Sequence, residues 1–260
     1  MKALWLFHRA LLRVLRLPRA LVALILQPVL VLWLLCQLFG QLPPSLHSFA
    51  VPTYLAFVTP ALAVVSALPI AIAGGAHVVE DRESGFLEQV LATPATPAML
   101  LAGELAASAL STLITVPAVV LAAEAAGLTP GGGVGGALAL LPLALALNVL
   151  YAGLSVAVAA LVPAKSTVLR SMGAIIVGCL LISDFLLPEA LLPQWLVTLS
   201  RLNPLAYAID GARVVLRQHH SWSGYVHDLL VVAGVAAISV GVALALQARR
   251  AEAQLSVFPA

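Results

Sequence analysis

Charged residues are scarce in this sequence of 260 residues: they make up 9% of the chain, whereas hydrophobic residues make up 62%. A soluble domain carries roughly a quarter charged residues, so the chain has too little polar surface to face water. The formal net charge of +2 is small and gives no reason to expect a nucleic-acid partner. The composition therefore excludes an ordinary soluble domain and predicts a protein whose solvent is the lipid bilayer.

Lysine and cysteine are also rare. A phosphate-binding loop of the form Gly-x-x-x-x-Gly-Lys-Ser/Thr is missing, because the lysine followed by serine, Lys165, is preceded by Val-Pro-Ala. Cys36 and Cys179 lie far apart in apolar runs without metal-ligand or disulfide spacing, and we expect both to pack as small hydrophobes. No nucleophile and base arrangement is recognisable either. We expect neither enzymatic activity nor a bound cofactor or metal.

Long apolar runs, in contrast, are abundant. Six of them reach the length of about 20 residues that a helix needs to cross the hydrocarbon layer. Helix is the expected structure, because main-chain polar groups in lipid must bond within their own segment. The sequence predicts an all-α polytopic membrane protein. The expected spans run from Ala20 to Phe39, Tyr54 to Gly75, Met99 to Ala122, Ala137 to Leu161, Thr167 to Leu186 and Val226 to Leu246.

Orientation follows from the basic residues, which gather on the cytoplasmic side of membrane proteins. With six spans, both termini and one set of connections carry basic residues, whereas the two short loops of the opposite set carry none. Both termini are therefore expected in the cytoplasm. The long connection over residues 187–225 is an exception with three arginines, but long loops follow the rule poorly. The residues that set the orientation are Lys2, Arg9, Arg13, Arg16, Arg19, Arg82, Lys165, Arg170, Arg249 and Arg250.

The segment before the first span, residues 1–18, has an amphipathic pattern. At 100° per residue its basic residues fall on one side of a helix, and Leu4, Phe7, Leu11 and Val14 face the other side. This pattern is typical of a helix lying in the membrane interface, and Pro18 is expected to end it.

The densest cluster of charges, EDRESGFLEQ over residues 80–89, follows the second span. A short charged helix on a cytoplasmic loop, at residues 76–98, would suit docking against a soluble partner. The alternative is a solvated loop that only joins two spans, which is the commoner role of a charged run.

A second motif precedes the last span. LLPQWLVTLSRLNPLAYAIDGARVVL, over residues 191–216, has an Asn-Pro-x-x-Tyr core followed by an acidic residue and an arginine. Asn203 and Pro204 are expected to end one helical piece and start the next. Tyr207, Asp210 and Arg213 are expected to form a hydrogen-bonded cluster that closes the outer end of a pathway, or only to hold a re-entrant fold.

Together, the two motifs, the size, the six spans and the interfacial helix resemble the type-2 ATP-binding-cassette export permeases, which export drugs, nodulation factors and polysaccharides. The resemblance covers the whole chain, 1–260, as one permease domain of the bacterial cytoplasmic membrane with a re-entrant external region at 187–225. It implies that ATP and magnesium bind a separate cassette ATPase, present in two copies. The residues implied as the ATPase-coupling surface are Glu80, Arg82, Glu83, Gly85 and Glu88.

Two residues depart from the pattern of that family, namely Glu104 and Asp184. A carboxylate within the membrane costs roughly 2.5 to 3.5 kcal/mol, so these two and Glu124 are expected near span ends or facing protein. His219, His220 and His227 lack regular metal-ligand spacing, and no metal is assigned to them.

The leading hypothesis is an exporter subunit that pairs with an identical or closely related second subunit in the lipid bilayer, because a pathway is most easily built between two subunits. The alternatives are an ion-coupled secondary transporter, for which no internal repeat is found, and a membrane enzyme or scaffold. Few aromatic residues, 6% of the chain, favour an amphiphilic drug, lipid or glycolipid over a sugar polymer, which needs stacking partners.

Overall fold

The structure is a computed structural model that describes residues 18–40, 53–85, 97–128, 133–216 and 222–255. Regular structure in these residues is helical, and six spans are long and apolar enough to cross a membrane. This confirms the predicted all-α, six-span fold. The predicted interfacial helix lies outside the described residues, apart from Pro18, where the first described helix begins. The spans are α2 (Pro18–Phe39), α3 with α4 (Tyr54–Val65 and Leu68–Glu83), α6 (Pro97–Ala125), α7 (Gly133–Leu161), α8 (Lys165–Ile182) and α11 (Trp222–Leu255).

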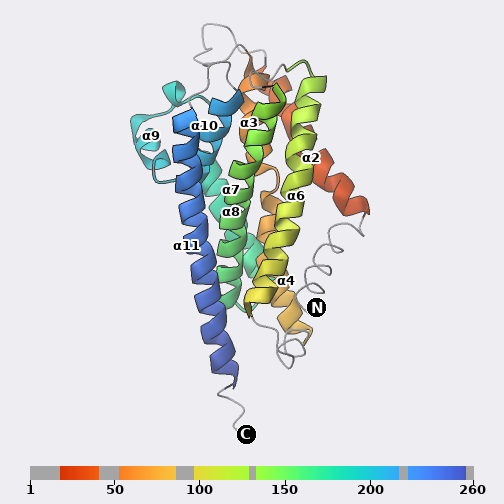
Figure 1. The fold of residues 1–260 in the computed structure, drawn as a ribbon, viewed down its shortest axis with the longest axis vertical. Helices are drawn as coiled ribbons and strands as arrows, with labels where there is room; N and C mark the ends of the chain where they lie inside the picture. The colour runs from red at the N-terminus through yellow and green to blue at the C-terminus, as the bar shows by residue number, and fades with distance from the viewer. Residues whose placement is uncertain (1–17, 41–52, 86–96, 129–132, 217–221, 256–260) are drawn as a thin grey trace.

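The connection between α8 and α11 folds into three short pieces at one end of the bundle (Figure 1). They are η2 (Glu189–Leu191), α9 (Gln194–Ser200) and α10 (Pro204–Leu216). We call this end of the molecule the α10 end. At the opposite end, which we call the basic end, α4, α7 and α11 finish and α8 begins (Figure 1).

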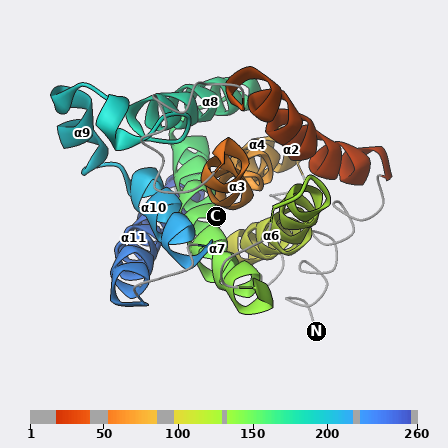
Figure 2. The same ribbon diagram turned by 90° about the horizontal axis from the view of Figure 1, so that it is seen from above.

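Helix α7 lies at the centre of the bundle, between α4 and α6 on one side and α10 and α11 on the other (Figure 2). Its buried residues include Leu140, Leu143, Leu147 and Tyr151. Helix α3 is also an inner element, since ten of its 12 residues are buried. Helices α2, α8 and α11 lie at the periphery and expose many apolar side chains, as expected of surfaces in contact with lipid.

The second span differs from its prediction in two ways. It is divided at Ser66 and Ala67 into α3 and α4, where a single helix was expected. It also continues to Glu83 instead of ending near Gly75. Pro69 follows the division directly and has no amide hydrogen for the carbonyl of Val65, four residues before it.

The other span boundaries shift by several residues. Helices α6 and α7 are longer than predicted, and α11 begins at Trp222 and extends to Leu255. Helix α8 ends at Ile182 instead of Leu186, because Ser183 has an extended backbone and its amide bonds the carbonyl of Leu180. Between α6 and α7, Gly127 and Gly133 have positive φ values of 98° and 55°, which suit glycine at the two ends of a turn.

Candidate functional site

At the basic end, three of the predicted coupling residues, Glu80, Arg82 and Glu83, lie on the last turn of α4. Glu80 accepts a hydrogen bond from the ammonium of Lys165 at 2.7 Å, and Lys165 begins α8. Arg82 donates to the main-chain carbonyl of Ala159 near the end of α7, at 2.8 Å. The charged turn is therefore bonded to two neighbouring spans.

Glu80 to Glu83 continue the second span as part of α4. Arg82 turns inward to α7, whereas Glu83 is exposed. Gly85 follows with a φ of 70°, a left-handed conformation that suits glycine. Glu88 lies outside the described residues.

Helix α11 is tied to the same end of α7. Arg250 donates to the carbonyls of Ala159, at 3.3 Å, and Ala160. One helical turn earlier, the amide of Gln247 donates to the carbonyl of Val156 at 3.2 Å. The last carbonyls of a helix have no partner within it, so Arg82 and Arg250 together cap α7.

At the α10 end, Arg213 is the central residue. Its side chain is only 4% exposed and forms an ion pair with Asp184, which follows α8. It also donates to the main-chain carbonyls of Asp184, at 2.8 Å, and of Phe57, at 3.3 Å. The guanidinium carbon lies 3.8 Å from the centre of the Phe57 ring. One arginine thus joins α10 to α3 and to the segment after α8.

Asn203 positions the start of α10. Its carbonyl oxygen accepts from the amide of Leu205 at 3.1 Å, which is the bond of an N-terminal cap. Its side-chain amide donates to the carbonyl of Cys179 in α8 at 2.7 Å. Pro204 is the first residue of α10, where a missing amide hydrogen costs nothing.

The predicted cluster on α10 is only partly present. The Oδ1 atom of Asp210 lies 3.9 Å from Nη1 of Arg213. The hydroxyl of Tyr207 does not join them but donates to the main-chain carbonyl of Arg201 at 2.9 Å. Six residues correspond to 600°, which leaves Tyr207 about 120° away from Arg213 around the helix axis.

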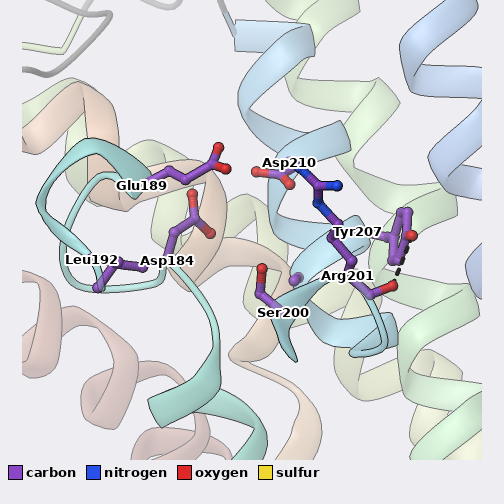
Figure 3. Close-up of a pocket in the computed structure, with 8 residues that line it drawn as sticks. Asp184, Glu189, Leu192, Ser200, Arg201, Tyr207 and Asp210 are labelled. Atoms are coloured by element: carbon purple, nitrogen blue, oxygen red, sulfur yellow. Dashed lines mark hydrogen bonds between the residues drawn. The ribbon is translucent and has the colours of Figure 1, made fainter. Parts of the chain in front are cut away.

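A cavity of 230 Å³ lies between η2, α9 and α10. In Figure 3 the carboxyl groups of Asp184, Glu189 and Asp210 turn toward the same space. Enclosure by protein, followed by the negative charge of Asp184, raises the pKa of Asp210 to about 7 against the opposing effect of Arg213. The Asp210 side chain is nevertheless 59% exposed, so its proton exchanges readily with solvent. The cavity is lined by Asp184, Glu189, Leu192, Ser200, Arg201, Ala206, Tyr207 and Asp210.

Sequence reasoning missed the role of Asp184, which was noted only as a departure from the family pattern. Its Oδ2 atom pairs with Arg213, whereas its Oδ1 atom is buried and has no hydrogen-bond partner among the described residues. No sequence pattern signals this pair, because Asp184 and Arg213 are 29 positions apart. Their contact depends on how the connection between α8 and α10 folds. Glu189 and Arg201 were missed for the same reason.

A second pair lies between two spans. His77 of α4 and Glu104 of α6 approach to 3.3 Å, and the Glu104 side chain is 12% exposed. Glu104 thus faces protein, as a carboxylate in a span should. His227 contacts its neighbour Asp228 at 3.1 Å, whereas His219 and His220 lie outside the described residues. In the part of the chain that the structure describes, no group of three potential metal ligands is found.

Comparison with known proteins identifies the family. Residues 1–216 match the family model described as ABC-2 type transporter. A protein of Porphyra purpurea described as a transport permease, ycf38, is 31% identical over 212 residues, which cover 81% of this chain and 72% of the relative. The protein of the same description from Pyropia yezoensis is 31% identical over 214 residues, covering 80% and 71%. With six spans and these matches, the chain belongs to the ABC-2 type transporter family of multi-pass membrane permeases.

Proposed function

We propose that this chain is the permease subunit of an ATP-driven exporter. Two copies, or one copy and a close relative, enclose the substrate pathway, and two separate cassette ATPases drive it. Membership of a family of transport permeases supports a membrane transport role. The substrate is an amphiphilic drug, lipid or glycolipid, and the membrane is the bacterial cytoplasmic membrane with both termini inside.

The observation that carries the proposal is the bonding of the last turn of α4. Glu83 and Ser84 are exposed there, next to the left-handed turn at Gly85. The same turn is bonded to α7 through Arg82 and to α8 through Glu80. A partner that pushes on the exposed turn would therefore act on α4, α7 and α8 together, which would couple the ATPase to the bundle.

The distribution of basic residues supports the orientation. Arg82, Lys165 and Arg250 lie at the basic end of the described bundle. At the α10 end, Arg201 and Arg213 belong to the long connection between α8 and α11, and long connections follow the rule poorly.

Helix α8 supports a second subunit. It leaves Ser166, Arg170 and Ala174 exposed on one side, and nothing lies within 4 Å of a methyl group added to Gly173 or Gly178. A charged side chain in contact with lipid is costly, so a second subunit or the pathway between two subunits is the better neighbour for Arg170.

The experiment is to co-express the chain with a cassette ATPase encoded beside it and to measure ATP hydrolysis and ATP-dependent transport of an amphiphilic dye in proteoliposomes. Glu83→Arg with Glu88→Arg should uncouple hydrolysis from transport while the protein still inserts. Glu124→Arg, a charge reversal on an exposed residue near the other end of α6, is the matched control and should retain coupling.

Two results would contradict the proposal. Transport driven by an ion gradient without any ATPase would favour the ion-coupled alternative, for which the His77 and Glu104 pair would be the first candidate. Equal uncoupling by Glu124→Arg would show that the effect is not specific to the end of α4.

A further inference from the structure

The division of the second span lies beside buried polar side chains. At the division, the amide of Ile70 bonds the carbonyl of Ala67 only three residues back, at 3.2 Å. Pro69 lacks an amide hydrogen, so the carbonyl of Val65 loses its regular helical partner. The regular helical hydrogen bonding of this span is thus interrupted at residues 66–69.

Asn148 of α7 bonds to this point from outside the span. Its side-chain amide donates to the carbonyl of Ala67 at 3.2 Å, and its carbonyl oxygen accepts from the hydroxyl of Ser108 in α6. Asn148 and Ser108 are 1% and 2% exposed. Buried asparagine in a membrane core is costly unless it is hydrogen-bonded, and here both of its polar atoms are used.

On the side of the division toward the basic end, α4 is hydrogen-bonded to α7. The hydroxyl of Ser155 donates to the carbonyl of Ile72 at 2.6 Å and accepts from the amide of Gly75 at 3.1 Å. A methyl group added to Gly75 would lie 2.1 Å from the carbonyl oxygen of Ser155, so the two backbones are in close contact. Further along, Arg82 bonds the carbonyl of Ala159.

Asn148, Ser155 and Ala159 are seven and four residues apart, so they follow one face of α7. The three hydrogen bonds of Ser155 and Arg82 on the basic-end side of the division join α4 and α7 into one unit. Above the division, α3 is held by Arg213 of α10 through the carbonyl of Phe57. Both halves of the second span contact α7, but α3 packs most closely against α10, whereas α4 packs most closely against α7.

We propose that residues 66–69 form a hinge within the second span and that Asn148 is the positioning residue that holds it. The inference rests on the proposed function for the source of the movement, an ATPase acting at the basic end. When α4 is pushed there, α4 moves with α7 while α3 stays with α10, and the angle changes at the hinge. Asn148 sets the resting angle by bonding the carbonyl of Ala67.

The test measures distances between pairs of spin labels in the full chain after Cys36 and Cys179 are replaced by serine. One pair, at Ala56 and Ala73, crosses the hinge along about 26 Å of helix. The other pair, at Ala73 and Leu138, joins α4 to the far part of α7 without crossing it. Leu138 is exposed, and Ala56 and Ala73 are partly exposed.

In the chain without ATPase, Asn148→Leu should broaden the distance distribution of the pair across the hinge. Thr115→Ala, the control, removes a buried hydroxyl that bonds the carbonyl of Ser111 within its own helix α6 and should leave that distribution unchanged. Where Asn148→Leu does not insert into the membrane, Ser108→Ala removes one of the two bonds of Asn148 and should give the same broadening to a smaller degree. Equal distributions for the hinge variant and the control would overturn the proposal.

In the complex with the ATPase, trapping with ATP and vanadate should shift the pair across the hinge by about 2 Å or more, the size of helix movements in switching transitions. The pair that does not cross the hinge should keep its distance.

Pro69→Ala restores the missing amide hydrogen and should abolish the shift while ATP hydrolysis continues. A shift that persists in Pro69→Ala, or that is equal in both pairs, would refute the hinge even if the chain is an ATP-driven permease. Failure to bind any ATPase would instead refute the proposed function and leave the hinge to be decided by the measurements without ATPase.

Discussion

Arginine side chains secure both ends of the helix bundle, but in different surroundings. At the α10 end, Arg213 is buried and pairs with a carboxylate as well as with main-chain carbonyls. At the basic end, Arg82 and Arg250 are only partly buried and bond carbonyls at the end of α7. Burial decides how much stability is lost when each arginine is removed. A buried partner is left without a hydrogen bond from protein or water, whereas an exposed partner can bond water instead.

The largest effect is expected at the α10 end. Arg213→Met leaves Asp184 as an unpaired and mostly buried carboxylate, which should destabilise the protein by about 3 to 5 kcal/mol. The measurement is the heat-induced loss of folded protein in detergent. Arg201→Met, in which an exposed arginine of the same region is removed, should have little effect. Arg213→Met combined with Asp184→Leu should recover most of the loss, and failure to recover would show that the carboxylate is not its cause.

The packing of the basic half gives the next largest effect. Gly75→Ala forces a methyl group to within 2.1 Å of the Ser155 carbonyl oxygen, and overpacking of this kind costs about 1 to 3 kcal/mol. The control is Gly173→Ala in α8, where nothing lies within 4 Å of the added methyl group. The control should be neutral or stabilising, since alanine favours helix. Thermal stability of the two variants separates them, and equal losses would contradict the close contact of α4 with α7.

A smaller effect is expected from the arginines of the basic end. Arg82→Ala should cost about 1 kcal/mol, the usual contribution of a hydrogen bond. Arg250→Ala should cost a similar amount. Because both side chains bond the carbonyl of Ala159, the double variant should be non-additive. Strict additivity in thermal unfolding would mean that the two arginines act independently.

The smallest effect is a dependence on pH at the α10 end. Asp210 has a pKa of about 7 in the folded protein, above its usual value near 4. A raised pKa means that the folded state holds the proton more tightly, so this contribution to stability is present at low pH and is lost as the pH rises through about 7. Asp210→Asn should flatten the dependence of the melting temperature on pH between about 4 and 7. The effect is small because the side chain is largely exposed.

The two ends also differ in how far the sequence predicts them. The six spans could be predicted because a long apolar run in lipid has few alternatives to helix. The start of α10 could be predicted because an Asn-Pro pair acts locally, and the structure has the expected cap at Asn203. Such features depend on neighbours along the chain.

Contacts between distant segments could not be predicted in the same way. Pro60, Pro117 and Pro142 lie inside uninterrupted helices, whereas the second span divides just before Pro69, so proline alone does not mark the division. The direction of Arg82 depends on where α7 ends, and the pairing of Arg213 depends on the path of the chain after α8. These features require the packed bundle.

The most direct test of the account is to ask which end of the bundle the ATPase touches. A photoreactive amino acid is placed at Ser84, on the exposed turn after α4, or at Trp195, which is 67% exposed on α9 at the α10 end. Each variant is co-expressed with the cassette ATPase and irradiated in membranes. The account predicts an adduct with the ATPase from position 84 and none from position 195. An adduct from position 195, or none from either position, would contradict it.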